Sequence, residues 1–222
     1  QTNLFPDFVP EGVAAFTEPV RDRMVIPIDD PPDKLQGLIT HELTHVFEFD
    51  LIPRSLLQRT VPLWIDEGLA DYMRGTWDTL DLMMVRDAAV TEQVPQLSRA
   101  EFQPLSGRLV YNLGHAAFEF IAERWGKEGM RQFLYTWRKN VVGGKLDDIY
   151  QQAFRIQPEE FDEAFDKWLK ERFKPYRDKQ RPSDYGKNLS PNEDHTSLTQ
   201  VFAAAASPSG ELVAALTANR SD

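Results

Sequence analysis

The spacing of apolar positions predicts a chain that is helical over most of its length. After Pro31 and Pro32, apolar side chains recur three and four positions apart as far as Pro53, which is typical of one buried helix face. The segment "WIDEGLADY" has the same spacing, and Gly75 follows it as a helix stop. Further helices are predicted over residues 78–91, 106–125, 128–140, 146–154 and 158–173.

Two other segments predict strands. The run Met24–Ile28 leads into a turn of Asp and Pro and predicts a small sheet edge before the first long helix. Near the end of the chain, two apolar runs flank Ser207-Pro208-Ser209-Gly210, which predicts a β-hairpin after a polar, turn-rich linker. We therefore expect an α+β, predominantly helical domain over residues 1–176, followed by the linker and hairpin over 177–222.

Composition and charge restrict the classes of function. Of the 222 residues, 41% are hydrophobic and 27% are charged, which is typical of a folded globular chain. The formal net charge of -10, without any cluster of Lys and Arg, argues against a nucleic-acid partner. No apolar run is long enough for a transmembrane segment. Because the chain has no cysteine, a metal would have to be held by His, Asp or Glu.

The sequence "HELTH" in the first long helix carries the main chemical signal. His41 and His45 are four positions apart, so both imidazoles project from one helix face and can reach one Zn²⁺ ion at about 2.0–2.1 Å. Glu42 lies to the side of such an ion, where it can take a proton from an attacking water. The alternative is a solvated helix face, but the apolar surroundings of these three polar residues favour a metal.

A catalytic zinc site needs a third protein ligand. The pattern that supplies a third histidine is absent, because Glu48 and Leu51 occupy its positions. Glu67 on the following helix is the remaining candidate, and Gly68 beside it leaves room for a close approach of two helices. Asp71, one turn after Glu67, is expected to accept a hydrogen bond from the second ring nitrogen of a ligand histidine.

"HELTH" followed by "WIDEGLADY" resembles the gluzincin zinc metallopeptidases. The later stretch from "LVYNLGHAAFEF" to "FDKWLKERF" is similar to the C-terminal helices of their bacterial peptidase-MA-like branch. The resemblance implies zinc held by His41, His45 and Glu67, with Glu42 as general base in the hydrolysis of a peptide or protein substrate. It also implies that residues 1–30 enter such a domain partway, and that the protein is exported to the periplasm, the cell surface or the medium.

The hairpin sequence "AAAASPSGELVAAL" is similar to a strand pair of TolB-type, WD40-like propeller blades. Such blades follow some peptidase domains in exported bacterial proteins, so the resemblance implies a C-terminal β-propeller in the full-length chain.

Gluzincins commonly place a Tyr or His opposite the general base, where it stabilises the oxyanion. Tyr111 is our candidate catalytic residue for this role. His115 lies one turn later on the same predicted helix, and Gly114 between them permits a close approach to another backbone. The alternative for both side chains is a place in the core or on the surface, and the role of His115 stays open.

Two functions of different classes remain. The first is a zinc metallopeptidase, and the same zinc chemistry would serve a non-peptide amide or ester. The second is a catalytically silent, zinc-stabilised scaffold attached to a β-propeller. Glu42 favours the enzyme, because a structural zinc site needs no general base and usually has four protein ligands. If the substrate is a peptide, the strand Met24–Ile28 could receive it as an added strand.

Overall fold

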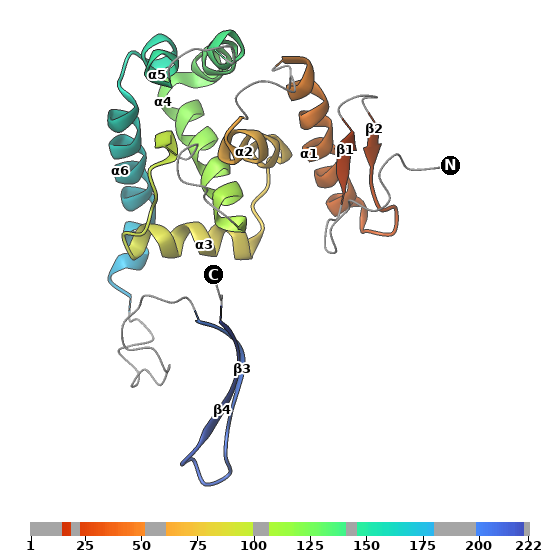
Figure 1. Cartoon of the computed structure of the whole chain (residues 1–222), viewed down its shortest axis with the longest axis vertical. Helices are drawn as coiled ribbons and strands as arrows, with labels where there is room; N and C mark the ends of the chain where they lie inside the picture. The colour runs from red at the N-terminus through yellow and green to blue at the C-terminus, as the bar shows by residue number, and fades with distance from the viewer. Residues whose placement is uncertain are drawn as a thin grey trace. The chain divides into compact units, whose positions relative to one another are not determined.

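The computed structural model describes residues 15–18, 23–51, 61–99, 107–140, 146–179 and 199–219. Most of the predicted linker, from residue 180 onward, and the predicted helix end at Pro53 lie outside these ranges. The chain divides into two compact units, Gln1–Asp178 and Lys179–Asp222, and each is treated by itself. Within the described residues the first unit is mostly helical, with six α-helices and one two-stranded antiparallel sheet (Figure 1).

The small sheet precedes the first helix. Strand β1 (Phe16–Glu18) pairs with β2 (Arg23–Val25), and Thr17 lies opposite Met24. The strand predicted over Met24–Ile28 is therefore shorter and begins one residue earlier. Pro27 offers no N–H to a sheet ladder, and Ile28 is 86% exposed, which explains why the strand ends at Val25.

The helices follow in a simple order. Helix α1 begins at Pro32, a residue suited to a helix start because it has no N–H to leave unsatisfied. Gly75 ends α2 with φ 75°, and Gly126 interrupts α4 with φ 68° and ψ -174°, so the two predicted helices 106–125 and 128–140 meet at this break. No helix of the described ranges is long and apolar enough to cross a membrane. The bounds are α1 Pro32–Leu51, α2 Leu63–Arg74, α3 Thr79–Val90, α4 Arg108–Asn140, α5 Leu146–Phe154 and α6 Pro158–Arg177.

An aromatic core holds the helices together. Trp64 of α2 is 1% exposed and stacks on Phe133 of α4, with ring centroids 6.1 Å apart. Phe161 of α6 stacks on the same indole at 6.4 Å, so one residue of α2 joins three helices. Burial of such large apolar side chains supplies most of the stability of a domain of this kind.

Helix α2 lies between α1 and α4 (Figure 1), and two glycines set its distance from α4. A Cβ atom added at Gly114 would lie 2.1 Å from the carbonyl oxygen of Trp64 and 2.8 Å from the Cα of Gly68. A Cβ added at Gly68 would lie 2.5 Å from the Cα of Gly114. The close approach expected at Gly68 is therefore to α4, and it requires glycine on both helices.

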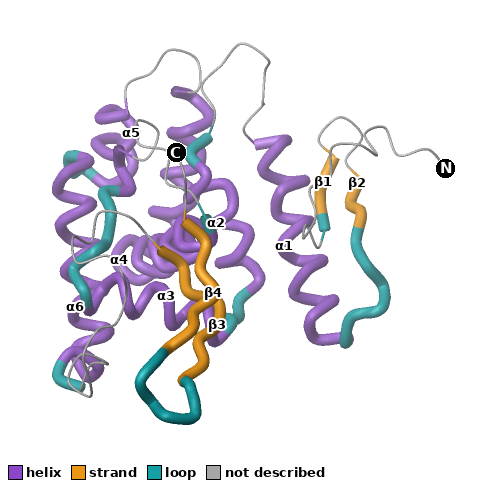
Figure 2. The backbone as a smooth tube through the Cα atoms, turned by 60° about the horizontal axis from the view of Figure 1, so that its bottom comes forward, coloured by secondary structure: helices purple, strands orange, loops and turns teal. Residues whose placement is uncertain are grey.

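The second unit contains the predicted hairpin. Strands β3 (Thr199–Ala206) and β4 (Val213–Asn219) pair antiparallel, and Gly210 adopts φ 75° in the turn between them (Figure 2). The alanines of β3 from 203 to 206 are exposed, as are Val213 and Leu216 of β4. An isolated two-stranded hairpin is marginally stable in water, so further strands or a covering surface would stabilise it.

The contact between the two glycines gives a testable prediction. Gly114→Ala should lower the free energy of unfolding by about 3 kcal/mol, because the added methyl group meets the backbone of α2, which cannot rotate away. For a domain of this size that loss corresponds to a fall in Tm of about 10 °C, measurable by circular dichroism.

Gly37→Ala on α1 is the matched control. Its Cβ would lie 3.2 Å from Cγ of Arg74, a flexible side chain that can move, while alanine raises helix propensity by about 1 kcal/mol. We expect its Tm to stay level or rise. Equal losses of Tm in the two variants would contradict the helix contact described above.

Candidate metal centre

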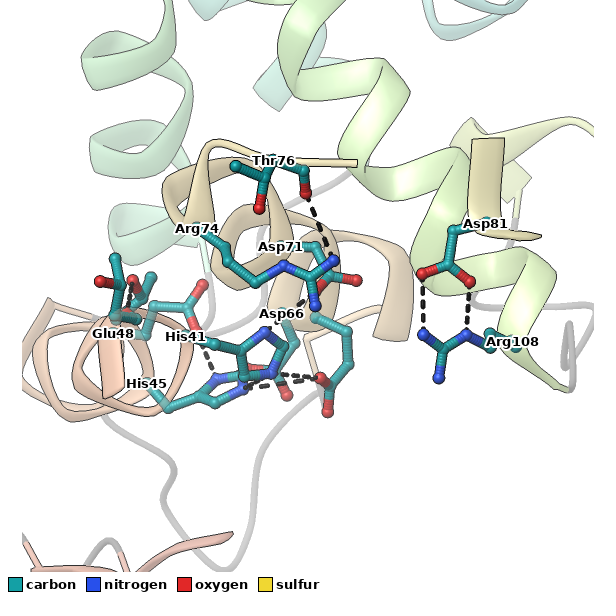
Figure 3. A network of polar contacts seen from close by, with 12 residues as sticks. His41, His45, Glu48, Asp66, Asp71, Arg74, Thr76, Asp81 and Arg108 are labelled. Atoms are coloured by element: carbon teal, nitrogen blue, oxygen red, sulfur yellow. Dashed lines mark hydrogen bonds and ion pairs between the residues drawn. The ribbon is translucent and has the colours of Figure 1, made fainter. Parts of the chain in front are cut away.

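Helices α1 and α2 bring three possible metal ligands together. His41 and His45 project from α1 toward α2 (Figure 3). Glu67 of α2 lies within 3.5 Å of both rings. The Nε2 atoms of the two histidines are 3.3 Å apart. Oε2 of Glu67 lies 3.3 Å from Nε2 of His41 and 3.5 Å from Nε2 of His45. The structure thus assembles the three residues that the sequence nominated as metal ligands.

The size of this triangle suits a single zinc ion. Four ligands at about 2.1 Å in a tetrahedron are separated by edges of about 3.4 Å, and the three separations of 3.3, 3.3 and 3.5 Å agree with that value. Two imidazole nitrogens and one carboxylate oxygen are also donors that zinc accepts readily. The residues present therefore fit a zinc ion with one further position free.

The electrostatics of the three groups show strong mutual attraction. Burial would lower the pKa of His41, but hydrogen bonds with Asp71 and Glu67 outweigh it and raise the pKa to about 9. Burial would raise the pKa of Glu67, but its contacts with His41 and His45 lower the value to about 2. Without a metal, the raised pKa of His41 lets a proton on its ring balance the Glu67 carboxylate, and a bound divalent cation would replace such a proton.

Carboxylates also engage the outer nitrogens of both rings. Nδ1 of His41 lies 3.0 Å from Oδ1 of Asp71, the type of contact that the spacing after Glu67 predicted for Asp71. Nδ1 of His45 lies 2.9 Å from Oε2 of Glu48 and 3.4 Å from Oδ1 of Asp66. Both rings therefore turn Nε2 toward Glu67, the arrangement typical of zinc-binding histidines.

Sequence reasoning missed the two acids beside His45. Glu48 stands one helical turn after His45, and Asp66 directly precedes Glu67. This spacing is enough to indicate that Glu48 lies near His45 and that Asp66 lies close to the candidate ligands. Burial and the neighbouring Asp66 carboxylate raise the pKa of Glu48 to about 8, although its contact with His45 opposes this shift. His45, Glu48 and Asp66 form a second group of side chains with metal-ligand geometry, and it shares His45 with the first.

Glu42 follows His41 on α1 and is held by the small sheet. Glu42 is buried, with 5% of its surface exposed. The hydroxyl of Thr17 on β1 lies 2.6 Å from Oε2 of Glu42 and 3.0 Å from its backbone oxygen, so it can donate to either. No local pattern in the sequence pointed to Thr17, because the contact joins segments that are distant along the chain.

Tyr111 and His115 on α4 have different surroundings. Burial raises the pKa of the Tyr111 phenol, and the carboxylates of Glu67, Asp66 and Asp71 raise it further, so the phenol lies within the field of the metal ligands. His115 is 4% exposed and stacks on Trp77, with ring centroids 3.8 Å apart. Burial lowers the pKa of His115 to about 4, so it is a neutral residue of the packed interior.

No protein-family model matches this chain, and searches of curated proteins and of solved structures find no significant similarity. The interpretation of the centre therefore depends on its residues and their geometry.

The three-ligand geometry predicts how the protein holds zinc. Dialysed against dilute zinc and then against metal-free buffer, the wild type should retain close to one zinc per chain by elemental analysis. Glu67→Ala should lose it, because the two remaining imidazoles hold zinc weakly. Asp50→Ala, which removes an exposed carboxylate from the same helix as the histidines, should retain it. Retention of zinc by Glu67→Ala would place the ion elsewhere, for example between His45, Glu48 and Asp66.

Proposed function

We propose that this protein is a zinc metallopeptidase of the gluzincin, peptidase-MA-like kind. The observation that carries the proposal is the triangle formed by His41, His45 and Glu67, whose sides of 3.3–3.5 Å match the edges of a zinc tetrahedron. Three protein ligands leave one position for substrate or water, which is characteristic of catalytic zinc sites. The resemblance of "HELTH" and "WIDEGLADY" to gluzincin motifs supports the same function.

Glu42 is the proposed general base. A bound zinc ion supplies Lewis acidity toward the scissile carbonyl and lowers the pKa of the attacking water. Glu42 follows His41 on α1, and its side chain belongs to neither group of metal ligands, so it stays available for proton transfer. With Oε2 held by Thr17, we assign proton acceptance to Oε1, from which the proton passes to the leaving amine.

Tyr111 is the proposed donor to the oxyanion. Its half-buried phenol lies in the field of the carboxylates that surround the metal ligands, and its raised pKa keeps the hydroxyl proton in place as a donor. The close contact of Gly114 with α2 holds this part of α4 near Glu67. His115 is not proposed for this role, because its ring is stacked on Trp77 within the core.

A peptide substrate also has a strand available to it. Among the described strands, β2 pairs only with β1, and its other edge is the proposed place for an extended peptide. The exported location and the C-terminal β-propeller are proposed from the sequence resemblance alone. The exposed apolar side chains of the hairpin are compatible with a larger β-domain.

The role of Glu42 can be tested by Glu42→Gln. We expect hydrolysis to fall at least about 10³-fold, since the amide cannot accept the proton, while zinc content stays at the wild-type level. The assay uses a panel of peptides and unfolded proteins beside simple esters, which also identifies the class of substrate. Asp50→Asn is the matched control, because it neutralises an exposed acid on the same helix, and it should retain activity. Zinc binding without hydrolysis in the wild type would favour the silent scaffold.

The role of Tyr111 can be tested by Tyr111→Phe. Loss of one donor to the oxyanion should lower kcat about 10²-fold and leave KM and zinc content nearly unchanged. Tyr135→Phe is the control, since Tyr135 lies on the same helix with 41% of its surface exposed. If Tyr111→Phe keeps the wild-type kcat, the phenol acts only in packing.

A further inference from the structure

The second zinc histidine faces an acid that belongs to its own helix. Oε2 of Glu48 lies 2.9 Å from Nδ1 of His45, and the two side chains are 8% and 10% exposed. The contact spans three positions of α1, so helix geometry alone places the pair on one face. Asp66 reaches the same nitrogen from α2, but at the longer distance of 3.4 Å.

The two edges of the His45 ring have separate partners. Nε2 faces Nε2 of His41 at 3.3 Å and Oε2 of Glu67 at 3.5 Å, whereas Nδ1 faces Glu48. An imidazole that binds a metal through Nε2 carries its proton on Nδ1, and that N–H needs an acceptor when it is buried. Of the two carboxylates near this nitrogen in the described part of the chain, Glu48 is the nearer.

The two histidines thus depend on different contacts for their orientation. The acceptor for His41 is Asp71, which α2 contributes, so the orientation of this ring depends on how α1 packs against α2. The acceptor for His45 comes from α1 itself. Half of the centre is therefore oriented within a single helix (Figure 3).

We propose that Glu48 is a positioning residue of the zinc centre: it accepts the Nδ1 hydrogen of His45 and thereby points Nε2 at the ion. Asp66, at 3.4 Å, is a more distant second acceptor for the same hydrogen. This inference rests on the zinc centre of the proposed function. It also assigns a role to the group His45, Glu48 and Asp66 that differs from a second metal site, because Nδ1 cannot donate a hydrogen to Glu48 and ligate an ion at once.

The test is the zinc affinity of two variants with side chains of similar size. Glu48→Met keeps the length of the side chain but removes the carboxylate, whereas Glu48→Gln keeps an oxygen that can accept the hydrogen bond. Competition against a chromogenic chelator should show about 10–100-fold weaker zinc binding for Glu48→Met, the usual effect of losing such a contact. Glu48→Gln should stay within about 3-fold of the wild type, and Asp50→Asn should not differ from it.

Double variants separate positioning from a general loss of charge. Glu48→Met and Asp66→Ala act on one nitrogen, so their effects on zinc affinity should not multiply. Glu48→Met and Asp71→Ala act on different rings, so their effects should multiply. Thermal melts of the metal-free variants check that each one is folded, and Glu48→Leu, which also lacks an acceptor, replaces Glu48→Met if the latter does not fold.

Three other results would contradict the positioning role of Glu48, and each has a different consequence for the zinc centre. Wild-type affinity in Glu48→Met, or equal losses in the Met and Gln variants, would remove the positioning role and leave the zinc centre and the proposed peptidase intact. A second equivalent of zinc in the wild type that Glu48→Met abolishes would make the acids a metal site. A wild type that binds no zinc would overturn the centre and the positioning role together.

Discussion

The contact of α2 with α4 at Gly68 and Gly114 is the constraint on which the candidate site depends. Neither position has room for a Cβ atom, so the two backbones meet there at a distance that only glycine permits. Glu67 directly precedes one of these glycines, and Tyr111 stands one turn before the other. A single helix contact therefore bears on the positions of Glu67, the third candidate ligand, and of the part of α4 that carries Tyr111.

The two faces of α2 bury different kinds of side chain. Toward α4 and α6 the core is aromatic and centred on Trp64. Toward α1 the interface is polar, with carboxylates that outnumber the two histidines and that are costly to bury without a cation. The aromatic side provides stability that the polar side does not, which allows α1 and α2 to enclose these ionisable groups. A bound divalent ion would stabilise this second interface as well as supply the chemistry.

A second set of side chains surrounds the candidate ligands and hydrogen-bonds to them or to Glu42. Asp71 and Glu48 orient the two rings from opposite sides, one from α2 and one from α1. Thr17 holds the proposed base from the small sheet, so the short strand β1 has a part in the site as well as in the fold. The proposed link of the hairpin unit to function rests on the sequence resemblance.

The sequence alone determined the features that depend on neighbouring positions along the chain. Helix periodicity places His41 and His45 on one face with Glu42 beside them, and Gly75 and Gly126 mark helix breaks because their backbone conformation favours glycine. Only the tertiary structure decided which distant groups complete the site. In the folded chain, Glu48 lies nearer to His45 than Asp66 does. The hydroxyl of Thr17 donates a hydrogen bond to Glu42, and the ring of His115 stacks on Trp77. Apart from the turn of α1 that joins His45 to Glu48, these contacts join distant segments, so they depend on packing, which no local pattern encodes.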